Sequence, residues 1–77
     1  MVKTDKPVVL CFSGHDPSGG AGISADIEAI SSNGCYVATV ITAMTVQDSQ
    51  DVMSFSPLPT DLIISQARAV LEDMPVN

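Results

Sequence analysis

One stretch constrains the fold of this chain more than any other, the glycine-rich segment over residues 13–26, which reads SGHDPSGGAGISAD. It directly follows an unbroken apolar run over residues 7–12, and it leads into a helical pattern. A strand that ends in a glycine-rich turn and enters a helix is a common way to build a small-molecule site. Glycines let the backbone approach a ligand, and the free N–H groups at the start of a helix attract an anion or a polar acceptor.

The segments around this turn alternate between strand and helix. The predicted elements are strands over residues 7–12, 35–45 and 52–56 and helices over residues 20–33 and 60–73. The first two strands are apolar and β-branched, which is typical of strands buried on both faces of a parallel sheet. Strand, helix and strand in this order form a βαβ unit, so these two strands should run parallel.

The helix boundaries rest on local signals. Ile23, Ile27 and Ile30 fall on one face of the first helix and predict a buried stripe. Gly34 after Asn33 predicts the helix end, since glycine accepts the left-handed conformation of a C-terminal cap. The proline at 75 ends the second helix. Residues 1–6 are expected to form a loose terminus.

Composition bounds the function. The chain has 77 residues, so it is one domain at most, yet 45% of its residues are hydrophobic and its mean hydropathy is +0.32. That apolar excess is high for a small domain and predicts a piece of something larger. The formal net charge of −6 argues against nucleic acid and acidic membranes as partners. No apolar run reaches the roughly 18 residues of a membrane span, and no signal peptide is evident.

The metal-binding and redox residues are few. Cys11 and Cys35 lie in apolar, strand-like contexts and are expected to be buried, reduced thiols of a cytoplasmic protein. His15 is the only histidine and there is no Cys-x-x-Cys pair, so the sequence predicts no metal site.

Three familiar glycine and serine motifs fail here. Gly14 and Gly19 have the spacing of a Walker A loop, but no lysine follows Lys6. A G-x-G-x-x-A match begins at Gly20, yet several residues separate it from the strand, and the second strand lacks the acid of a dinucleotide site at its end. Ser18 is not in a G-x-S-x-G context, and no second histidine is present as a base.

Two side chains remain as candidate ligand contacts. Asp26 borders the buried stripe of the first helix, so it is either a local hydrogen-bond partner of the glycine loop or a contact to a ligand. Gln47 follows the second strand, at the sheet edge where ligands of open α/β folds gather. Its amide both donates and accepts and is suited to the edge of a heterocycle, although a solvated loop glutamine has the same sequence signature.

The glycine segment and the run VITAMTVQDSQ over residues 40–50 together resemble the N-terminal part of the hydroxymethylpyrimidine/phosphomethylpyrimidine kinase family of thiamine biosynthesis. The family pattern is G-[ST]-D-P-S-G-G-A-G-I-Q-A-D followed by V-I-T-A-[LM]-T-A-Q-N-T. The resemblance runs without a gap from Val8 onward. It implies the N-terminal portion of a ribokinase-like three-layer α/β/α fold, here a βαβ unit with a short third strand and a second helix.

The resemblance also implies a site. Family residues matching Gly14, Ala21, Asp26 and Gln47 hold the pyrimidine. The sequence departs from the pattern at His15, where the family has a small hydroxyl residue, and at Asp51, where glycine is common. The family's ATP region, anion hole and catalytic residue lie in a C-terminal half that has no counterpart in these residues, so no catalytic residue, ATP contact or metal ligand is expected within residues 1–77.

We therefore expect residues 1–77 to be a partial ribokinase-like domain. Its parent would phosphorylate hydroxymethylpyrimidine and its monophosphate with ATP and Mg²⁺, whereas the chain alone would be inactive and oligomeric. Two alternatives remain open: a related vitamin kinase such as pyridoxal kinase, and a non-catalytic ligand-binding or assembly module. Comparing the binding of the two vitamin precursors separates the kinases. A stop codon after Asn77 would favour the module, and a continued reading frame would favour the fragment.

Overall fold

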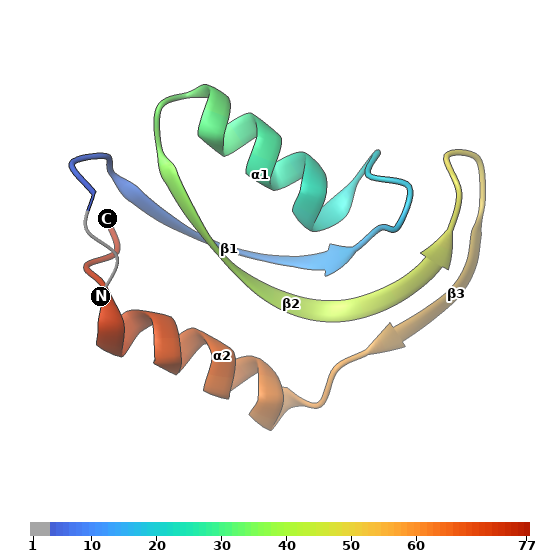
Figure 1. Cartoon of the computed structure of the whole chain (residues 1–77). Coiled ribbons are helices and arrows are strands. Elements are labelled where there is room, and N and C mark those ends of the chain that lie inside the picture. The colour runs from blue at the N-terminus through green and yellow to red at the C-terminus, as the bar shows by residue number, and fades with distance from the viewer. Residues whose placement is uncertain (1–3) are drawn as a thin grey trace.

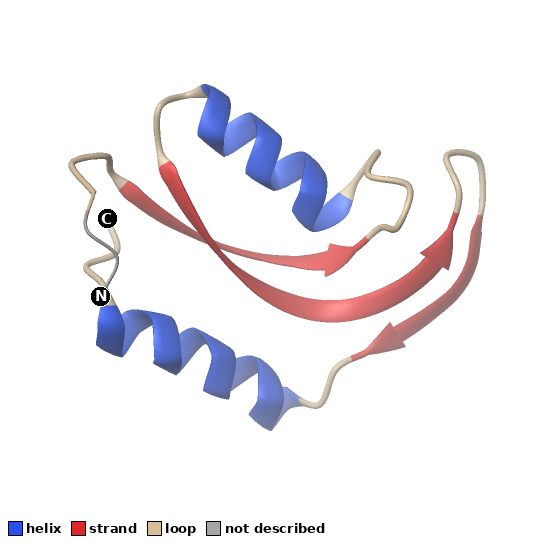
Figure 2. Cartoon of the chain, viewed as in Figure 1, coloured by secondary structure: helices blue, strands red, loops and turns tan. Residues whose placement is uncertain are grey.

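The computed structural model describes residues 4–77 as a three-stranded sheet with a helix on each face. The elements are β1 (Val8–His15), α1 (Gly22–Ser32), β2 (Tyr36–Gln47), β3 (Val52–Pro57) and α2 (Thr60–Asp73). In Figure 1, α1 lies above the sheet and α2 below it. The same view coloured by secondary structure separates the three layers (Figure 2), which confirms the α/β/α expectation.

The sheet has the order β1-β2-β3. β1 pairs with β2 in parallel, as a βαβ unit requires, and β3 returns antiparallel along the carboxyl-terminal part of β2. The β1–β2 register is regular from Val8↔Tyr36 to Ser13↔Ile41 and then shifts by one residue, so that Gly14 lies opposite Ala43. The extra residue, Thr42, lies on β2, opposite the point where the glycine-rich segment begins on β1.

The predicted helices are largely confirmed. The bounds of α2 match the prediction, and α1 is shorter than predicted by residues 20 and 21 at its start and by residue 33 at its end. The end of α1 has the predicted cap: Gly34 has a φ of 77°, its N–H donates to the Ser31 carbonyl at 3.0 Å, and the Cys35 N–H donates to the Ile30 carbonyl at 3.4 Å. These two bonds satisfy carbonyls that the helix end would otherwise leave unpaired.

The strands extend further than their apolar runs. β1 continues through His15 and β2 continues through Gln47, so residues expected in loops are paired in the sheet. Both extensions are explained by backbone hydrogen bonds to a neighbouring strand, which a local sequence pattern does not predict.

The buried core is small and is formed mainly by residues of β2, with Ile23 contributed by α1. Its apolar members are Val8, Ile23, Ala38, Val40 and Ala43, of which Val40 is fully enclosed. The predicted stripe of α1 is only partly buried, because Ile27 remains 39% exposed. Every residue of β3 is exposed, so both of its faces contact solvent. Residues 1–3 of the predicted loose terminus lie outside the described residues. Neither described helix combines the length and apolar content needed to cross a membrane.

Candidate functional site

The glycine-rich turn folds back on the end of β1. Gly22 opens α1 with a φ of 64°, and a Cβ at this position would collide with the carbonyl oxygen of Gly14. Only glycine has both the left-handed conformation and the missing side chain that this approach requires. The contact brings Ala21, which precedes α1, next to the end of β1. Two of the predicted site residues, Gly14 and Ala21, therefore lie at one place.

The start of α1 has free backbone donors. Ala21 occupies the N-cap position in an extended conformation, and its side chain makes no capping hydrogen bond. The first N–H groups of a helix have no partner within the helix, and the aligned peptide dipoles make this end positive. The turn can therefore bind a polar acceptor or an anion through its backbone.

Asp16 organises the same turn. Its Oδ1 accepts hydrogen bonds from the Ser18 backbone N–H at 2.8 Å and the Ser18 hydroxyl at 2.7 Å, and its carbonyl accepts from the Gly19 N–H at 3.0 Å. The Ser18 hydroxyl bond is the main reason that the pKa of Asp16 is lowered, with backbone N–H groups of Ser18, Ala21 and Gly20 adding to it. Only 4% of the Asp16 surface is exposed. Sequence reasoning missed this residue, although an Asp-Pro-Ser-Gly run is a typical side-chain-stabilised turn.

Asp26 lies one turn into α1 and faces β1. Burial raises the pKa of the Cys11 thiol, and the negative charge of Asp26 raises it further, which places the carboxylate near the middle of β1. Asp26 is half-buried. Among residues 4–77 no hydrogen bond joins this carboxylate to the glycine turn, so the structure does not show the local partnership, and a contact to a ligand stays a prediction.

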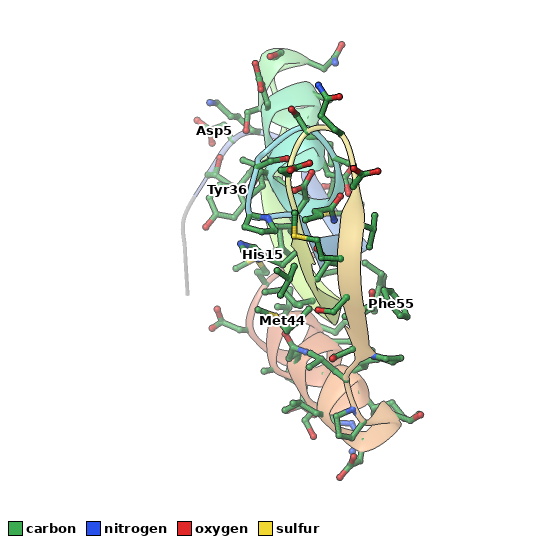
Figure 3. The ribbon with its side chains drawn as sticks, turned by 90° about the vertical axis from the view of Figure 1, so that its right-hand side faces the viewer. Asp5, His15, Tyr36, Met44 and Phe55 are labelled. Atoms are coloured by element: carbon green, nitrogen blue, oxygen red, sulfur yellow. The ribbon has the colours of Figure 1, made fainter. Side chains whose placement is uncertain are left out.

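Gln47 is the last residue of β2 rather than a residue of the following loop. Its Nε2 donates to the Thr45 hydroxyl at 2.6 Å, and that hydroxyl donates to the backbone carbonyl of His15 at 2.6 Å. Gln47 is thus connected, through Thr45, to the end of β1 and the start of the glycine turn. Figure 3 shows His15 and Met44 on one side of the ribbon and Phe55 projecting on the other. Sequence reasoning also missed Thr45, which has no distinguishing local signal.

The four predicted residues thus fall into two groups. Gly14, Ala21 and Gln47 lie around the carboxyl ends of β1 and β2, the edge where open α/β sheets bind ligands. Asp26 lies farther along α1, over β1. The residues from 4 to 77 contain no group of three or more His, Cys, Asp or Glu side chains that could hold a metal ion.

A hollow of about 520 Å³ lies elsewhere, against α2. Its lining is Phe12, Ile63, Ile64, Ala67, Arg68, Leu71 and Glu72. Its walls are mainly aliphatic, and it includes none of the glycine-turn residues. This surface resembles an uncovered packing face more than a site for a polar metabolite.

Comparison with known proteins supports the pyrimidine kinase resemblance. The chain is 41% identical over 70 residues to the hydroxymethylpyrimidine/phosphomethylpyrimidine kinase of Aquifex aeolicus, covering 91% of this chain and 28% of that enzyme. The crystal structure of phosphomethylpyrimidine kinase from Clostridium difficile 630 superposes with a TM-score of 0.85 at 42% identity, covering 92% of this chain and 31% of that one.

A vitamin kinase of different substrate has a similar structure. An ADP complex of Bacillus subtilis pyridoxal kinase superposes with a TM-score of 0.81 at 28% identity, covering 94% of this chain and 28% of that one. This chain therefore spans less than a third of the length of each of these three proteins. The phosphomethylpyrimidine kinase family pattern matches residues 16–77, which include α1, β2, β3 and α2, and the chain belongs to this family.

Proposed function

We propose that this chain forms the pyrimidine-binding part of a hydroxymethylpyrimidine/phosphomethylpyrimidine kinase. The complete enzyme transfers the γ-phosphate of ATP, with Mg²⁺, first to the hydroxymethyl group of 4-amino-5-hydroxymethyl-2-methylpyrimidine and then to the monophosphate, on the route to thiamine diphosphate. The observation that carries the proposal is the family match over residues 16–77, combined with the position of Gln47 beside the glycine turn. Residues 1–77 would form part of one ribokinase-like domain.

In this proposal the chain binds and orients the pyrimidine. Gly14 lies beside the ring, the backbone N–H groups after Ala21 donate to polar atoms of the ligand, and the Gln47 amide forms hydrogen bonds with the ring edge. Asp26 supplies a carboxylate from α1, on the side of this helix that faces β1. We propose no contact to Mg²⁺ or to the phosphates of ATP for these residues. Those contacts, and the catalytic residue, belong to the remainder of the kinase.

The test uses a chimera in which this chain replaces the matching segment of the Aquifex aeolicus kinase. Gln47→Ala should weaken pyrimidine binding by about 1–3 kcal/mol, because the buried polar edge of the ligand loses its partner. Isothermal titration measures this, and ATP affinity should change little. Gln50→Ala is the matched control, since Gln50 is an exposed glutamine in the next loop. Unchanged pyrimidine affinity in the Gln47 variant would remove Gln47 from the site.

Pyridoxal kinase is the second candidate, favoured by the likeness to the Bacillus subtilis enzyme. The higher identity to the phosphomethylpyrimidine kinase structure, 42% against 28%, supports the pyrimidine. Titrating the chimera with hydroxymethylpyrimidine and with pyridoxal separates the two. Tighter binding of pyridoxal would reverse the assignment.

Location and association are part of the same proposal. Cys11 and Cys35 were expected to be buried, but each is only half-buried. Both are free thiols, which fits a reducing compartment, and we place the kinase in the cytoplasm. Neither nucleic acid nor a membrane is proposed as a partner, since the net charge of −6 disfavours both. A self-associated state is proposed for the isolated chain.

A further inference from the structure

We infer that Thr45 is a positioning residue that fixes the orientation of the Gln47 amide and so selects ligands with an amino group beside a ring nitrogen. The inference rests on the proposed function, and it concerns a residue that contacts Gln47 rather than the ligand. Thr45 is half-buried, on β2, two residues before Gln47. Its hydroxyl lies within hydrogen-bond distance of two groups, the His15 carbonyl oxygen and the Gln47 Nε2, each at 2.6 Å.

The direction of each bond follows from the single proton of a hydroxyl group. A backbone carbonyl has no proton and can only accept, so the Thr45 hydroxyl must donate to His15. The same hydroxyl has no second proton and can only accept from its other partner. Gln47 must therefore turn its NH₂ group, and not its carbonyl, toward Thr45. This chemistry assigns the amide orientation, which atomic positions of oxygen and nitrogen seldom decide.

The orientation defines what Gln47 offers a ligand. The Oε1 atom accepts no hydrogen bond from residues 4–77, and the second proton of Nε2 is also free. The amide thus presents an acceptor and a donor side by side. The complementary ligand edge carries a donor next to an acceptor, which is the pattern of an exocyclic amino group beside a ring nitrogen. A 4-oxo pyrimidine, with a carbonyl beside a ring N–H, presents the reverse pattern and meets acceptor against acceptor and donor against donor.

A purely structural role for Thr45 makes a different prediction. The bond from Thr45 to His15 also ties β2 to β1, so its loss could loosen the sheet without affecting recognition. Thr45→Val removes the hydroxyl but keeps the branched shape, and Thr45→Ser keeps the hydroxyl but removes a methyl group. A structural effect lowers affinity for every ligand alike. Loss of amide orientation changes the ratio of affinities between the two ligand patterns.

The decisive experiment measures that ratio in the chimera with hydroxymethylpyrimidine and its 4-oxo counterpart. We expect the unsubstituted chimera and the Thr45→Ser variant to prefer the amino compound by roughly tenfold or more. The Thr45→Val variant should lose most of this preference, because its Gln47 amide is free to rotate. An unchanged preference in Thr45→Val would overturn the inference. Failure of the unsubstituted chimera to bind either compound would instead overturn the proposed function.

A second measurement uses the chimera without ligand. In the ¹⁵N-labelled chimera, the Gln47 side-chain protons should exchange with water more slowly than those of the exposed Gln50. Thr45→Val should abolish the difference and Thr45→Ser should retain it. Equal exchange at the two glutamines in the unsubstituted chimera would contradict the hydrogen bonds that connect Gln47 to His15 through Thr45.

Discussion

At the scale of single residues, Gly22 is the position that the glycine turn tolerates least. Its φ of 64° strains any other residue, and an added Cβ would strike the backbone of Gly14. Backbone atoms cannot move aside as a flexible side chain can, so Gly22→Ala should lower the free energy of unfolding by roughly 2–4 kcal/mol. Denaturant unfolding of the chimera measures the change.

Gly19 supplies the control for that substitution. It also has a positive φ, 77°, but a Cβ there meets nothing within 4 Å. Gly19→Ala should cost only the conformational strain, about 1 kcal/mol. If Gly19→Ala and Gly22→Ala lower the free energy of unfolding equally, the close approach of α1 to β1 adds nothing to the cost of Gly22→Ala.

The Asp16 carboxylate makes the turn sensitive to acid. The Ser18 hydroxyl and then the backbone N–H groups lower its folded-state pKa below the ordinary value of 3.8. Below pH 3.8 the Asp16 carboxylate binds a proton more readily in the unfolded chain than in the folded one. The stabilisation is therefore fully present above the unfolded pKa and is lost as pH falls through the lowered, folded pKa.

Asp16→Asn should flatten this acid dependence in unfolding experiments on the chimera across the range below about pH 4.5. The matched comparison is Asp48→Asn. Asp48 has a pKa lowered by the backbone N–H groups of Asp51 and Gln50, but it lies in the exposed loop after β2. If Asp16→Asn leaves the acid slope intact while Asp48→Asn flattens it, the turn carboxylate does not contribute to acid stability.

At the scale of elements, local patterns predict helices better than strand ends here. The bounds of α2 follow from an amphipathic repeat between a Pro-Leu-Pro break and Pro75, all local signals. The extra residues of β1 pair with β2 across 29 positions of sequence, as in His15↔Met44, and those of β2 pair with β3, as in Gln47↔Val52. Pairing with β3 explains why Gln47, expected beyond β2, lies within it. The bond from Thr45 to His15 joins residues 30 positions apart and had no sequence signal.

The docking of α2 on β2 depends on a contact that the sequence conceals. Gln66 lies midway along α2. Its side-chain amide accepts from the Ile41 N–H at 3.2 Å and donates to the Ile41 carbonyl at 3.0 Å. The amide therefore pairs with β2 as a neighbouring strand would, at a point that β3 does not reach.

Gln66→Met keeps the length of the side chain and removes both hydrogen bonds. We expect the free energy of unfolding to fall by about 1–3 kcal/mol, because the Ile41 backbone groups lose their partners in a partly buried setting. Chemical unfolding of the chimera measures the loss. Gln50→Met is the same chemical change at an exposed site and should be nearly neutral. A neutral Gln66→Met would show that apolar packing alone holds α2.

At the scale of the whole molecule, much apolar surface has no cover within residues 4–77. The large hydrophobic side chains with more than 50% of their surface exposed are Phe12, Val46, Val52, Met53, Phe55 and Leu71. Two of them, Phe12 and Leu71, line the hollow beside α2. The apolar excess in the sequence predicted a piece of something larger, but it did not locate the uncovered face. That location depends on which sides of β1 and α2 find partners in the fold.

The free edge of β1 adds to this incompleteness. Val8 donates its N–H to the Asn77 side-chain oxygen at 2.8 Å and accepts from the Asn77 backbone N–H at 2.9 Å. Beyond this pair, no strand within the described residues lies on that side of β1, since the sheet order is β1-β2-β3. An open edge beside exposed apolar side chains favours pairing with another chain.

The isolated 77-residue chain should therefore be catalytically silent and self-associated. In the proposed function the glycine turn and Gln47 orient a pyrimidine, but in-line phosphoryl transfer also requires groups that hold the phosphates and the metal. A coupled assay for ADP release, with hydroxymethylpyrimidine, ATP and Mg²⁺, should give no turnover above background, whereas the chimera turns over. Light scattering should give a mass above the 8.0 kDa of one chain. Turnover by the chain alone would contradict the proposal that this chain binds the pyrimidine while the rest of the kinase binds ATP and supplies the catalytic residue. A monodisperse monomer that unfolds cooperatively would contradict the predicted self-association. The free energy of exposing the apolar surface of β1 and α2 would then be too small to drive association.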